Sequence, residues 1–398
     1  MLSAIPCNHY TIPYILSPNK IMKILVLIHE FPPIGGGGGP IARDLSLQWV
    51  KAGHQVRVVT ARFGDLPARE NIEGLDVVRL DCHRTESFRA KMKAMIGYVT
   101  AASKYCLFDC KDFQPDLIHV HFAVPNGPVA MLASRKMKVP YVITAHLGDI
   151  PGASPEKTKT WFKYIQPFTP PIWKNAARVV AVSQYSRRMA LNSYNVPIDV
   201  IPNGIDYVKI KNNSIEPHEI PEIVFAGRFV PQKNLRQIVK TLSEIRDLNW
   251  HATLIGDGQE KDAVFNDVKS AGLQERISFP GWKTPEEVIE IFHNSDILFM
   301  PSLTEGLPVT GIQGMASGLA LMLSSAGGNP EIVTEGMNGF IHEPDDTDGY
   351  AVDFRKLLTD PDLLLKIRKS SVSAAAAFDI RETAAEYLKL FETVVSSQ

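Results

Sequence analysis

The sequence predicts an α/β protein made of two Rossmann-like domains with parallel sheets. The chain has 398 residues, more than one hydrophobic core usually supports, so two domains of about 200 residues are expected. Strand-length apolar runs, followed by turns and helical periodicity, start near Met22 and start again near Glu222. A polar stretch with prolines and asparagines, residues 209–221, separates the two series.

These observations predict five segments along the chain. We expect a poorly ordered tail over residues 1–21, a first domain over 22–206, a linker over 207–221, a second domain over 222–377 and a closing helix over 378–398. The tail lacks the basic start and apolar centre of a signal peptide. Because Met22 opens the first strand like a natural start, we expect the tail to pack poorly or to be absent from the mature protein.

Composition fits a soluble globular protein, with 45% hydrophobic residues, 21% charged residues and a net charge of −1. No run of about 18 apolar residues occurs, so no membrane span is expected. The four cysteines form no disulfide framework and fit a reducing, cytoplasmic compartment; they are Cys7, Cys82, Cys106 and Cys110. A metal site at Cys106 and Cys110 is disfavoured, because no pair of histidines lies nearby in sequence.

The near-zero net charge hides an uneven distribution. Residues 1–215 hold 26 basic and 15 acidic residues, and the remainder holds 16 basic and 28 acidic ones. The two parts therefore carry +11 and −12. A basic first half could serve an anionic membrane surface, or it could simply attract the acidic half and an anionic substrate.

The most informative stretch is residues 296–319, which reads as a buried strand, a tight turn and a helix. Pro308 fits the first helical turn, where its missing N–H costs nothing. The helix start offers an anion site. Glu305 lies too close to that site to be the partner of an anion, but its carboxylate suits hydroxyl groups. A phosphate beside hydroxyl groups indicates a sugar nucleotide.

Glu305-Gly306 and the segment from Gln313 to Gly318 resemble the E-x7-E signature of the retaining glycosyltransferases of family 4, which have the GT-B fold. The resemblance implies two Rossmann-like domains facing a cleft. It places Glu305 on the donor sugar hydroxyls, Gln313 on the nucleotide ribose, and Gly306 and Leu307 in the donor loop. Glutamine replaces the usual second glutamate, so the ribose bond would lack charge assistance.

Further motifs of the second half resemble the same family. Gly227-Arg-Phe-Val-Pro-Gln-Lys-Asn234 matches its Gly-Arg…Lys-Asn element, in which Arg228 and Lys233 would clamp the diphosphate. Two later strand ends contribute Gly258 and, near the nucleobase, Trp282. With these cations and the helix termini neutralising the diphosphate, the resemblance implies no metal and no further cofactor. We expect the acidic residues 345–348 to cap a helix.

Five glycines, residues 35–39, follow the first strand, and we expect a helix over 41–52. Such a loop lets backbone approach a ligand, although a flexible loop is the alternative. A dinucleotide site would need an acidic residue after the second strand, residues 55–61, and none is present. An NAD enzyme is therefore disfavoured. The loop resembles the first glycine-rich loop of family 4, in which Gly36, Gly37 and Gly38 would face the donor.

A strand over residues 141–145 ends in His146 and Asp149, and ligands gather at such strand ends. The turn resembles the His-Gly-x-Asp turn of part of the family, in which the histidine approaches the donor sugar. The alternative is a structural turn, with Asp149 as its cap. His119 and His121 share one face of another strand, but zinc is disfavoured because no third ligand is evident.

A helix is expected over residues 87–107, with Phe88, Met92, Met95 and Val99 on one side. Its basic residues are Arg89, Lys91, Lys93 and Lys104. It is interpreted as a helix packed on its domain or as a membrane-surface element. The aromatic and basic segment over residues 161–168 is a candidate acceptor contact.

The resemblance implies glycosyl transfer, with retention, from a UDP- or GDP-sugar to a glycan or lipid-linked acceptor in cell-surface polysaccharide or glycolipid synthesis. No carboxylate is clearly placed as a covalent nucleophile, which favours a front-face mechanism in which the leaving phosphate assists the acceptor. The alternatives are a GT-B epimerase or hydrolase and a non-catalytic GT-B subunit. We expect a cytoplasmic protein, peripheral at the inner face of the plasma membrane if the basic helix binds lipid, and no nucleic acid partner.

Overall fold

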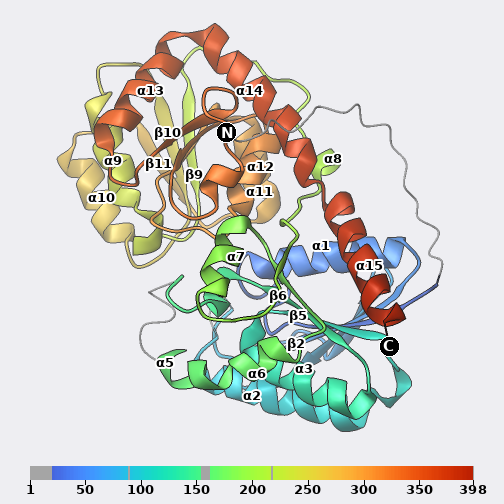
Figure 1. The fold of residues 1–398 in the computed structure, drawn as a ribbon. Helices are drawn as coiled ribbons and strands as arrows, with labels where there is room; N and C mark the ends of the chain where they lie inside the picture. The colour runs from blue at the N-terminus through green and yellow to red at the C-terminus, as the bar shows by residue number, and fades with distance from the viewer. Residues whose placement is uncertain (1–19, 88–89, 154–161, 217, 398) are drawn as a thin grey trace.

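A computed structural model describes residues 20–87, 90–153, 162–216 and 218–397. It contains two α/β lobes joined by a short connection and by the last helix (Figure 1). The predicted tail lies almost entirely outside the described residues, as do Phe88, Arg89 and Trp161. This is the GT-B architecture that the sequence predicted.

The first lobe contains an eight-stranded sheet in the order β3-β4-β2-β1-β5-β6-β7-β8. Its strands are parallel except for β3, which pairs antiparallel with β4. Its elements are β1 Lys23–Leu27, α1 Gly38–Lys51, β2 Gln55–Ala61, β3 Arg69–Ile72, β4 Leu75–Leu80, α2 Met92–Lys104, the π-helix η1 Tyr105–Asp109, η2 Cys110–Asp112, β5 Leu117–His121, α3 Ala123–Met137, β6 Tyr141–Ala145, η3 Leu147–Asp149, α5 Phe162–Ile165, η4 Gln166–Phe168, α6 Pro170–Lys174, β7 Arg178–Ala181, α7 Gln184–Leu191 and β8 Asp199–Val200.

The second lobe contains a fully parallel sheet in the order β11-β10-β9-β12-β13-β14. Its elements, with the connecting α8 and the closing α15, are α8 Tyr207–Ile210, β9 Glu222–Ala226, η5 Pro231–Lys233, α9 Leu235–Glu244, β10 His251–Ile255, α10 Lys261–Ser270, β11 Ile277–Gly281, α11 Pro285–His293, β12 Ile297–Met300, α12 Val309–Ala316, β13 Ala320–Ser324, η6 Asn329–Glu331, β14 Gly339–His342, α13 Thr347–Thr359, α14 Pro361–Ala375, η7 Ala376–Phe378 and α15 Ile380–Ser396. As expected, an acidic residue, Asp346, caps α13.

The last helix returns to the first lobe, where α15 lies beside α1 (Figure 1). The Trp49 indole of α1 donates a hydrogen bond to the Ala384 carbonyl of α15 at 3.1 Å. Phe391 packs edge-on against Trp49, with ring centroids 5.2 Å apart. Because these side chains are fully buried, α15 completes the hydrophobic core of the first lobe.

Two helix starts differ from the sequence prediction. Helix α1 begins at Gly38, before the expected residue 41, because the glycine before it already has helical angles and Pro40 fits the first turn. Helix α12 begins after Pro308, which occupies the N-cap position. In both cases proline lies where no N–H donor is needed.

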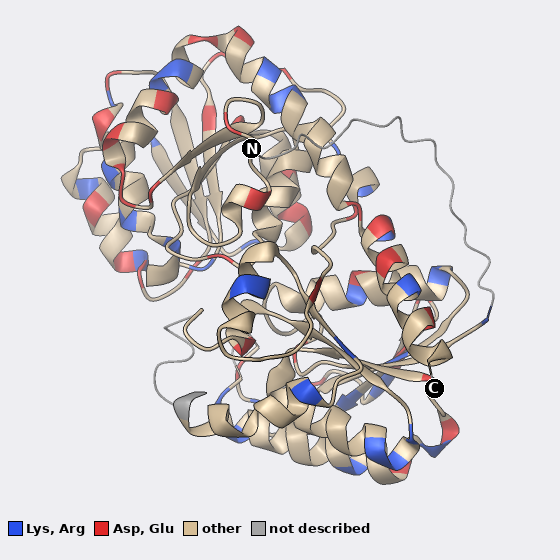
Figure 2. Cartoon of the chain, viewed as in Figure 1, with Lys and Arg blue, Asp and Glu red and all other residues tan. Residues whose placement is uncertain are grey.

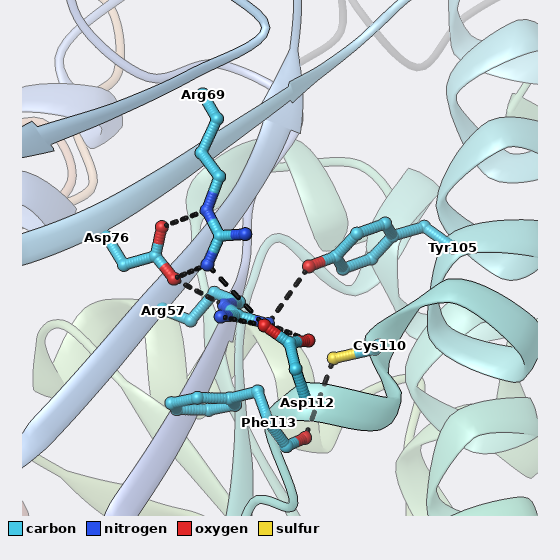
Figure 3. A network of polar contacts seen from close by, with 7 residues as sticks. All are labelled: Arg57, Arg69, Asp76, Tyr105, Cys110, Asp112 and Phe113. Carbon is cyan, nitrogen blue, oxygen red and sulfur yellow. Dashed lines mark hydrogen bonds and ion pairs between the residues drawn. The ribbon is translucent and has the colours of Figure 1, made fainter.

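An ion-pair network fixes the segment after α2 to the first sheet (Figure 3). Arg57 of β2 donates to Asp76 of β4 at 2.6 Å and to both carboxylate oxygens of Asp112 at 2.8 Å. It also donates to the Tyr105 hydroxyl at 3.2 Å, and Arg69 of β3 donates to Asp76 at 2.8 Å. Cys106 and Cys110 are buried in this region, and the described cysteines are free.

Helix α2 buries a different side from the one that the sequence indicated. Ala94, Tyr98 and Ala102 are buried against the domain, whereas Met92 is 42% exposed. Met95 and Val99 are half-buried. The helix packs on α3, and small side chains allow a close approach, so the larger apolar residues remain at the edge. No described helix is both long and apolar enough to cross a bilayer.

Candidate active site

In the second lobe, the loops after β9 and β12 come together around one ion pair. The Lys233 ammonium donates to Glu305 Oε1 at 2.6 Å. Both side chains are largely buried, with 15% and 10% exposed. Arg228, predicted as the second diphosphate cation, is exposed. No hydrogen bond or ion pair joins its side chain to another described residue, so its guanidinium is available to an anion.

Two hydrogen bonds join the loop after β9 to the loop after β12. The Gln232 side chain donates to the Thr304 carbonyl at 2.7 Å, and the Leu303 amide donates to the Gln232 carbonyl at 2.8 Å. The loop then turns into α9 at Asn234, which has a φ of +52°. Lys233 therefore extends from a loop that is hydrogen-bonded to the segment carrying Glu305.

Two glycines, Gly327 and Gly328, pack against the backbone of the Glu305 loop. The Gly328 amide donates to the Glu305 carbonyl at 3.0 Å. A Cβ atom on Gly327 would lie 2.0 Å from the Glu305 carbonyl oxygen, and one on Gly328 would lie 2.0 Å from that of Gly306. Only glycine permits this approach. The Gly-Gly-Asn-Pro-Glu run after β13 thus supports the backbone of the Glu305 loop.

The remaining predicted donor contacts follow β10, β11 and β12 of the same sheet. Gly258 follows β10 with a φ of +153°, and a Cβ atom on it would lie 2.5 Å from the Phe229 carbonyl oxygen. Trp282 follows β11 and is 50% exposed, and Leu307 is buried. Gln313 lies on α12 and is half-buried. Its side-chain amide forms no hydrogen bond with the described residues, so it is available to bind a ribose hydroxyl.

In the first lobe, His146 follows β6 and is held by its neighbours. The His121 Nδ1 and His146 Nε2 atoms lie 3.3 Å apart. Phe122 lies against the His146 ring at a centroid distance of 4.2 Å. Asp149 is 1% exposed. Its carboxylate accepts the His146 amide at 2.9 Å and the Val124 amide at 3.1 Å, so Asp149 fixes the backbone of the turn.

The glycine loop meets this group at Gly38. A Cβ atom on Gly38 would lie 2.6 Å from Phe122 Cζ and 3.7 Å from His146 Cε1. Phe122 has a φ of +67°, and its carbonyl accepts a hydrogen bond from the buried Asn126 amide at 3.2 Å. Gly36 and Gly37 have no atom within 4 Å of an added Cβ. The loop therefore combines one tight contact with two open positions.

The two lobes touch beside Glu305 and His146. A Cβ atom on Gly306 would lie 3.5 Å from Leu147 Cβ. The Ser183 hydroxyl donates to the Gly306 carbonyl at 2.8 Å. The Glu331 carboxylate accepts the amides of Gln184 and Tyr185, at 2.8 and 2.7 Å, at the start of α7, where the helix dipole favours an anion. The first contact brings the loop after β12 against the turn after β6, and the other contacts join the second lobe to the start of α7.

The structure thus brings together Lys233, Glu305 and Gly306 in the second lobe, and Gly38, His146 and Asp149 in the first. The sequence suggests His121 only as a disfavoured metal ligand and indicates no role for Phe122 or Glu331. The sequence does show that His121 ends one strand and that His146 follows the next, which could have indicated that the two rings meet. Nothing in the sequence indicated the positive φ of Phe122. The described residues contain no group of three or more His, Cys, Asp or Glu side chains suited to a metal ion.

Comparisons with known proteins find related sequences over both lobes. The family model described as "Glycosyltransferase Family 4" matches residues 35–209, and "Glycosyl transferases group 1" matches residues 207–373. An uncharacterized glycosyltransferase, MJ1178, of Methanocaldococcus jannaschii is 26% identical over 94% of this chain and 98% of its own length. The 2-deoxystreptamine glucosyltransferase of Streptomyces kanamyceticus is 24% identical over 89% of this chain and 98% of its own.

Solved structures show the same fold. Sucrose-phosphate synthase from Thermosynechococcus elongatus superposes with a TM-score of 0.82 at 18% identity, covering 95% of this chain and all of that one. Anabaena HepE, solved in complex with UDP and glucose, gives 0.72 at 19% identity, covering 94% of this chain and all of that one.

Proposed function

Because the chain belongs to the family 4 type of GT-B glycosyltransferases, we propose that it transfers a sugar from a UDP- or GDP-sugar with retention of the anomeric configuration. The acceptor is a glycan or a lipid-linked glycan of cell-surface polysaccharide or glycolipid synthesis. The proposal depends on one observation above all: the loop of Glu305 and Gly306 lies against the turn of His146 and Leu147. A sugar bound by Glu305 would therefore lie within reach of the first lobe.

The donor occupies the strand ends of the second lobe. Arg228 and Lys233 bind the diphosphate, Glu305 the sugar hydroxyls, Gln313 the ribose, and Trp282 lies near the base. The exposed Arg228 and the half-buried, unbonded Gln313 amide support this assignment. Further support comes from the related fold of HepE, whose solved complex contains UDP and glucose. The loop after β9 supplies two cations, Arg228 and Lys233, and the loop after β12 supplies one carboxylate, Glu305, so these three side chains carry a net positive charge that suits a diphosphate.

Departure of the nucleoside diphosphate builds negative charge on its terminal phosphate. Arg228, Lys233 and the backbone amides after Glu305 stabilise that charge, and preorganised donors of this kind are the usual source of such catalysis. The phosphate then accepts the proton of the incoming acceptor hydroxyl on the same face. His146 and the glycine loop hold the sugar. Because these cations neutralise the diphosphate, the proposal requires no metal.

The acceptor binds to the first lobe. A pocket of about 470 Å³ opens beside the glycine loop at the ends of β1 and β2, with a mainly apolar lining. Its apolar residues are Pro33, Ile34, Phe63, Leu66 and Pro67. The pocket is wide open to solvent, so it offers an apolar surface for part of an organic ligand and does not enclose it. It suits the apolar portion of a lipid-linked acceptor.

A membrane surface would present such an acceptor. On the helices at the lower side of the first lobe, the charged residues are mostly Lys and Arg, whereas the second lobe carries Asp and Glu interspersed with Lys and Arg (Figure 2). Large apolar side chains are exposed on the same lobe, among them Ile96 at 60%, Phe108 at 60% and Phe168 at 74%. Basic residues near anionic lipid contribute about 1 kcal/mol each, and apolar insertion adds to this. We propose peripheral binding to an anionic bilayer from the cytoplasmic side.

Two experiments test these proposals. The protein is incubated with a panel of UDP- and GDP-sugars, with and without membrane lipid extract, while nucleoside diphosphate release and product glycan are measured. Release that depends on the extract supports transfer. Isomerised donor indicates an epimerase, release of free sugar only indicates a hydrolase, and binding without turnover indicates a non-catalytic subunit.

For the membrane, co-sedimentation with anionic vesicles should rise with anionic lipid content and fall with salt, because salt screens exposed charges. Charge reversal at Lys93 and Lys104 should release the protein. The matched reversal at Lys240 and Lys269, two exposed lysines of the second lobe, should not. Indifference to anionic vesicles at low salt would contradict the membrane proposal and leave a soluble acceptor.

A further inference from the structure

We propose that His121 is a positioning residue that fixes the His146 ring for the sugar, an inference that rests on the proposed role of His146. His121 is the last residue of β5 and pairs with Thr144 of the neighbouring β6. Its Nδ1 atom lies 3.3 Å from His146 Nε2. The two rings are nearly parallel, with an interplanar angle of 24° and centroids 5.6 Å apart. His121 is fully buried.

His121 acts on His146 from inside the domain. His146 is 8% exposed, Phe122 covers one ring face at 4.2 Å, and Gly38 lies near its Cε1 edge. The contact with His121 supplies a hydrogen bond that packing alone cannot give. The χ2 torsion of histidine is broad and roughly two-fold. A hydrogen bond to Nε2 therefore selects one orientation of the His146 ring.

Burial keeps His121 neutral, which suits this task. Burial, with the nearby His119 and His146, holds the pKa of His121 well below its usual range. Burial likewise lowers the pKa of His119 to about 3. A neutral imidazole can donate at one nitrogen and accept at the other. His121 can therefore keep its bond to His146 without adding a charge that would repel a protonated His146.

Buried hydrogen bonds also link β5, β6 and the closing helix α15 next to the His121–His146 pair. His119 Nε2 lies 2.8 Å from the Thr144 hydroxyl, which lies 2.7 Å from the Tyr387 hydroxyl of α15. The His119 and His121 ring centroids are 4.4 Å apart. All of these side chains are buried. The closing helix therefore braces the two strands whose ends carry His121 and His146.

Two substitutions separate positioning from packing. His121→Leu removes the ring nitrogen, whereas His121→Asn places an amide near the position of Nδ1 that can donate or accept. We expect His121→Leu to lower kcat by about tenfold or more, with little change in donor KM, because small displacements of a group that orients the reacting sugar are costly. His121→Asn should recover most of the loss. His54→Leu replaces another buried histidine, bonded to the Met22 amide at 3.1 Å, and should retain kcat.

Equal kcat losses in the Leu and Asn variants, or wild-type kcat in His121→Leu, would overturn the inference. A substrate-free measurement keeps it separate from the proposed function. In protein labelled with ¹⁵N-histidine, the His146 ring signals, assigned by their loss in His146→Gln, should shift in His121→Leu and return toward wild type in His121→Asn. Unchanged signals in both variants would refute the contact even if no sugar nucleotide is turned over. If the variants show these shifts but the wild-type protein turns over no sugar nucleotide, only the proposed function is contradicted.

Discussion

Lys233 donates a hydrogen bond of 2.6 Å to Glu305, a residue 72 positions later in the chain. The pair joins the loop after β9 to the loop after β12, and its two side chains are largely buried. Our proposal assigns one partner to the diphosphate and the other to the sugar hydroxyls. A donor would therefore bind across an existing ion pair, and loss of either partner should disturb both subsites.

Lys233→Ala should weaken nucleoside diphosphate binding by about tenfold to a hundredfold, because a charge-assisted bond contributes about 1.5–3 kcal/mol. It should also lower the melting temperature, since Glu305 loses its buried partner. Arg228→Ala is the matched control: it removes an exposed cation and should weaken binding without lowering the melting temperature. Calorimetry and thermal unfolding measure both effects. Near-normal binding in both variants would contradict the assigned diphosphate site.

The unusual glutamine at position 313 offers a second test. If its amide bonds the ribose, Gln313→Glu should preserve or tighten binding of the nucleoside diphosphate, because a charged acceptor forms the stronger bond. Gln313→Leu has no polar group and should weaken binding. Calorimetry with UDP and GDP compares the three proteins. The same affinity in all three would mean that the side chain makes no contact with the nucleotide.

A third prediction concerns the tight contact of the glycine loop. Gly38→Ala would place its methyl group 2.6 Å from Phe122. The Phe122 ring must then move, and with it the surface on which His146 packs. We expect turnover to fall by about tenfold or more, because catalysis is sensitive to displacements of this size. Gly37→Ala, where an added Cβ has no neighbour within 4 Å, should reduce turnover far less. Similar losses of turnover in both variants would contradict the prediction, because they would point to reduced loop flexibility and not to the contact with Phe122.

The sequence was most informative where local patterns decide the structure. Apolar runs marked the strands at residues 55–61 and 222–226, and the structure has both with those bounds. It was least informative about pairs distant in the chain. Glu331 and Gln184 are 147 positions apart, and only the closure of two lobes brings them together. The buried side of α2 likewise depends on α3, which no periodicity within α2 reveals.

The Arg57 network, which sequence analysis did not anticipate, gives a pH-dependent prediction. Hydrogen bonds from Arg57 lower the pKa of Asp112 to about 2. Burial raises the pKa of Asp76, but hydrogen bonds from Arg69 and Arg57 outweigh it and lower that pKa overall. Because both folded pKa values lie below that of an unfolded aspartate, about 3.9, the network stabilises the fold above that pH. This contribution is lost as the pH falls from about 4 toward about 2.

The difference in free energy of unfolding between wild type and Asp112→Asn should therefore be largest near neutral pH and shrink below about pH 4. Because Asp112 is more than half exposed, we expect a modest difference. Urea unfolding at several pH values measures it. Asp65→Asn, which changes an exposed carboxylate outside the network, is the control for the loss of one negative charge. A constant difference for Asp112→Asn would show that the network does not couple its ionisation to folding.

The most direct test of retaining transfer follows the anomeric proton by NMR. With an α-linked nucleotide sugar and water as a slow acceptor, the first free sugar released by the enzyme is observed before it mutarotates. Front-face displacement, with the leaving diphosphate held by Arg228 and Lys233, predicts that this sugar is the α-anomer. It further predicts that release slows in Arg228→Ala and Lys233→Ala. A β-anomer as the first product, or no consumption of any sugar nucleotide in the presence of acceptor lipid, would contradict the account.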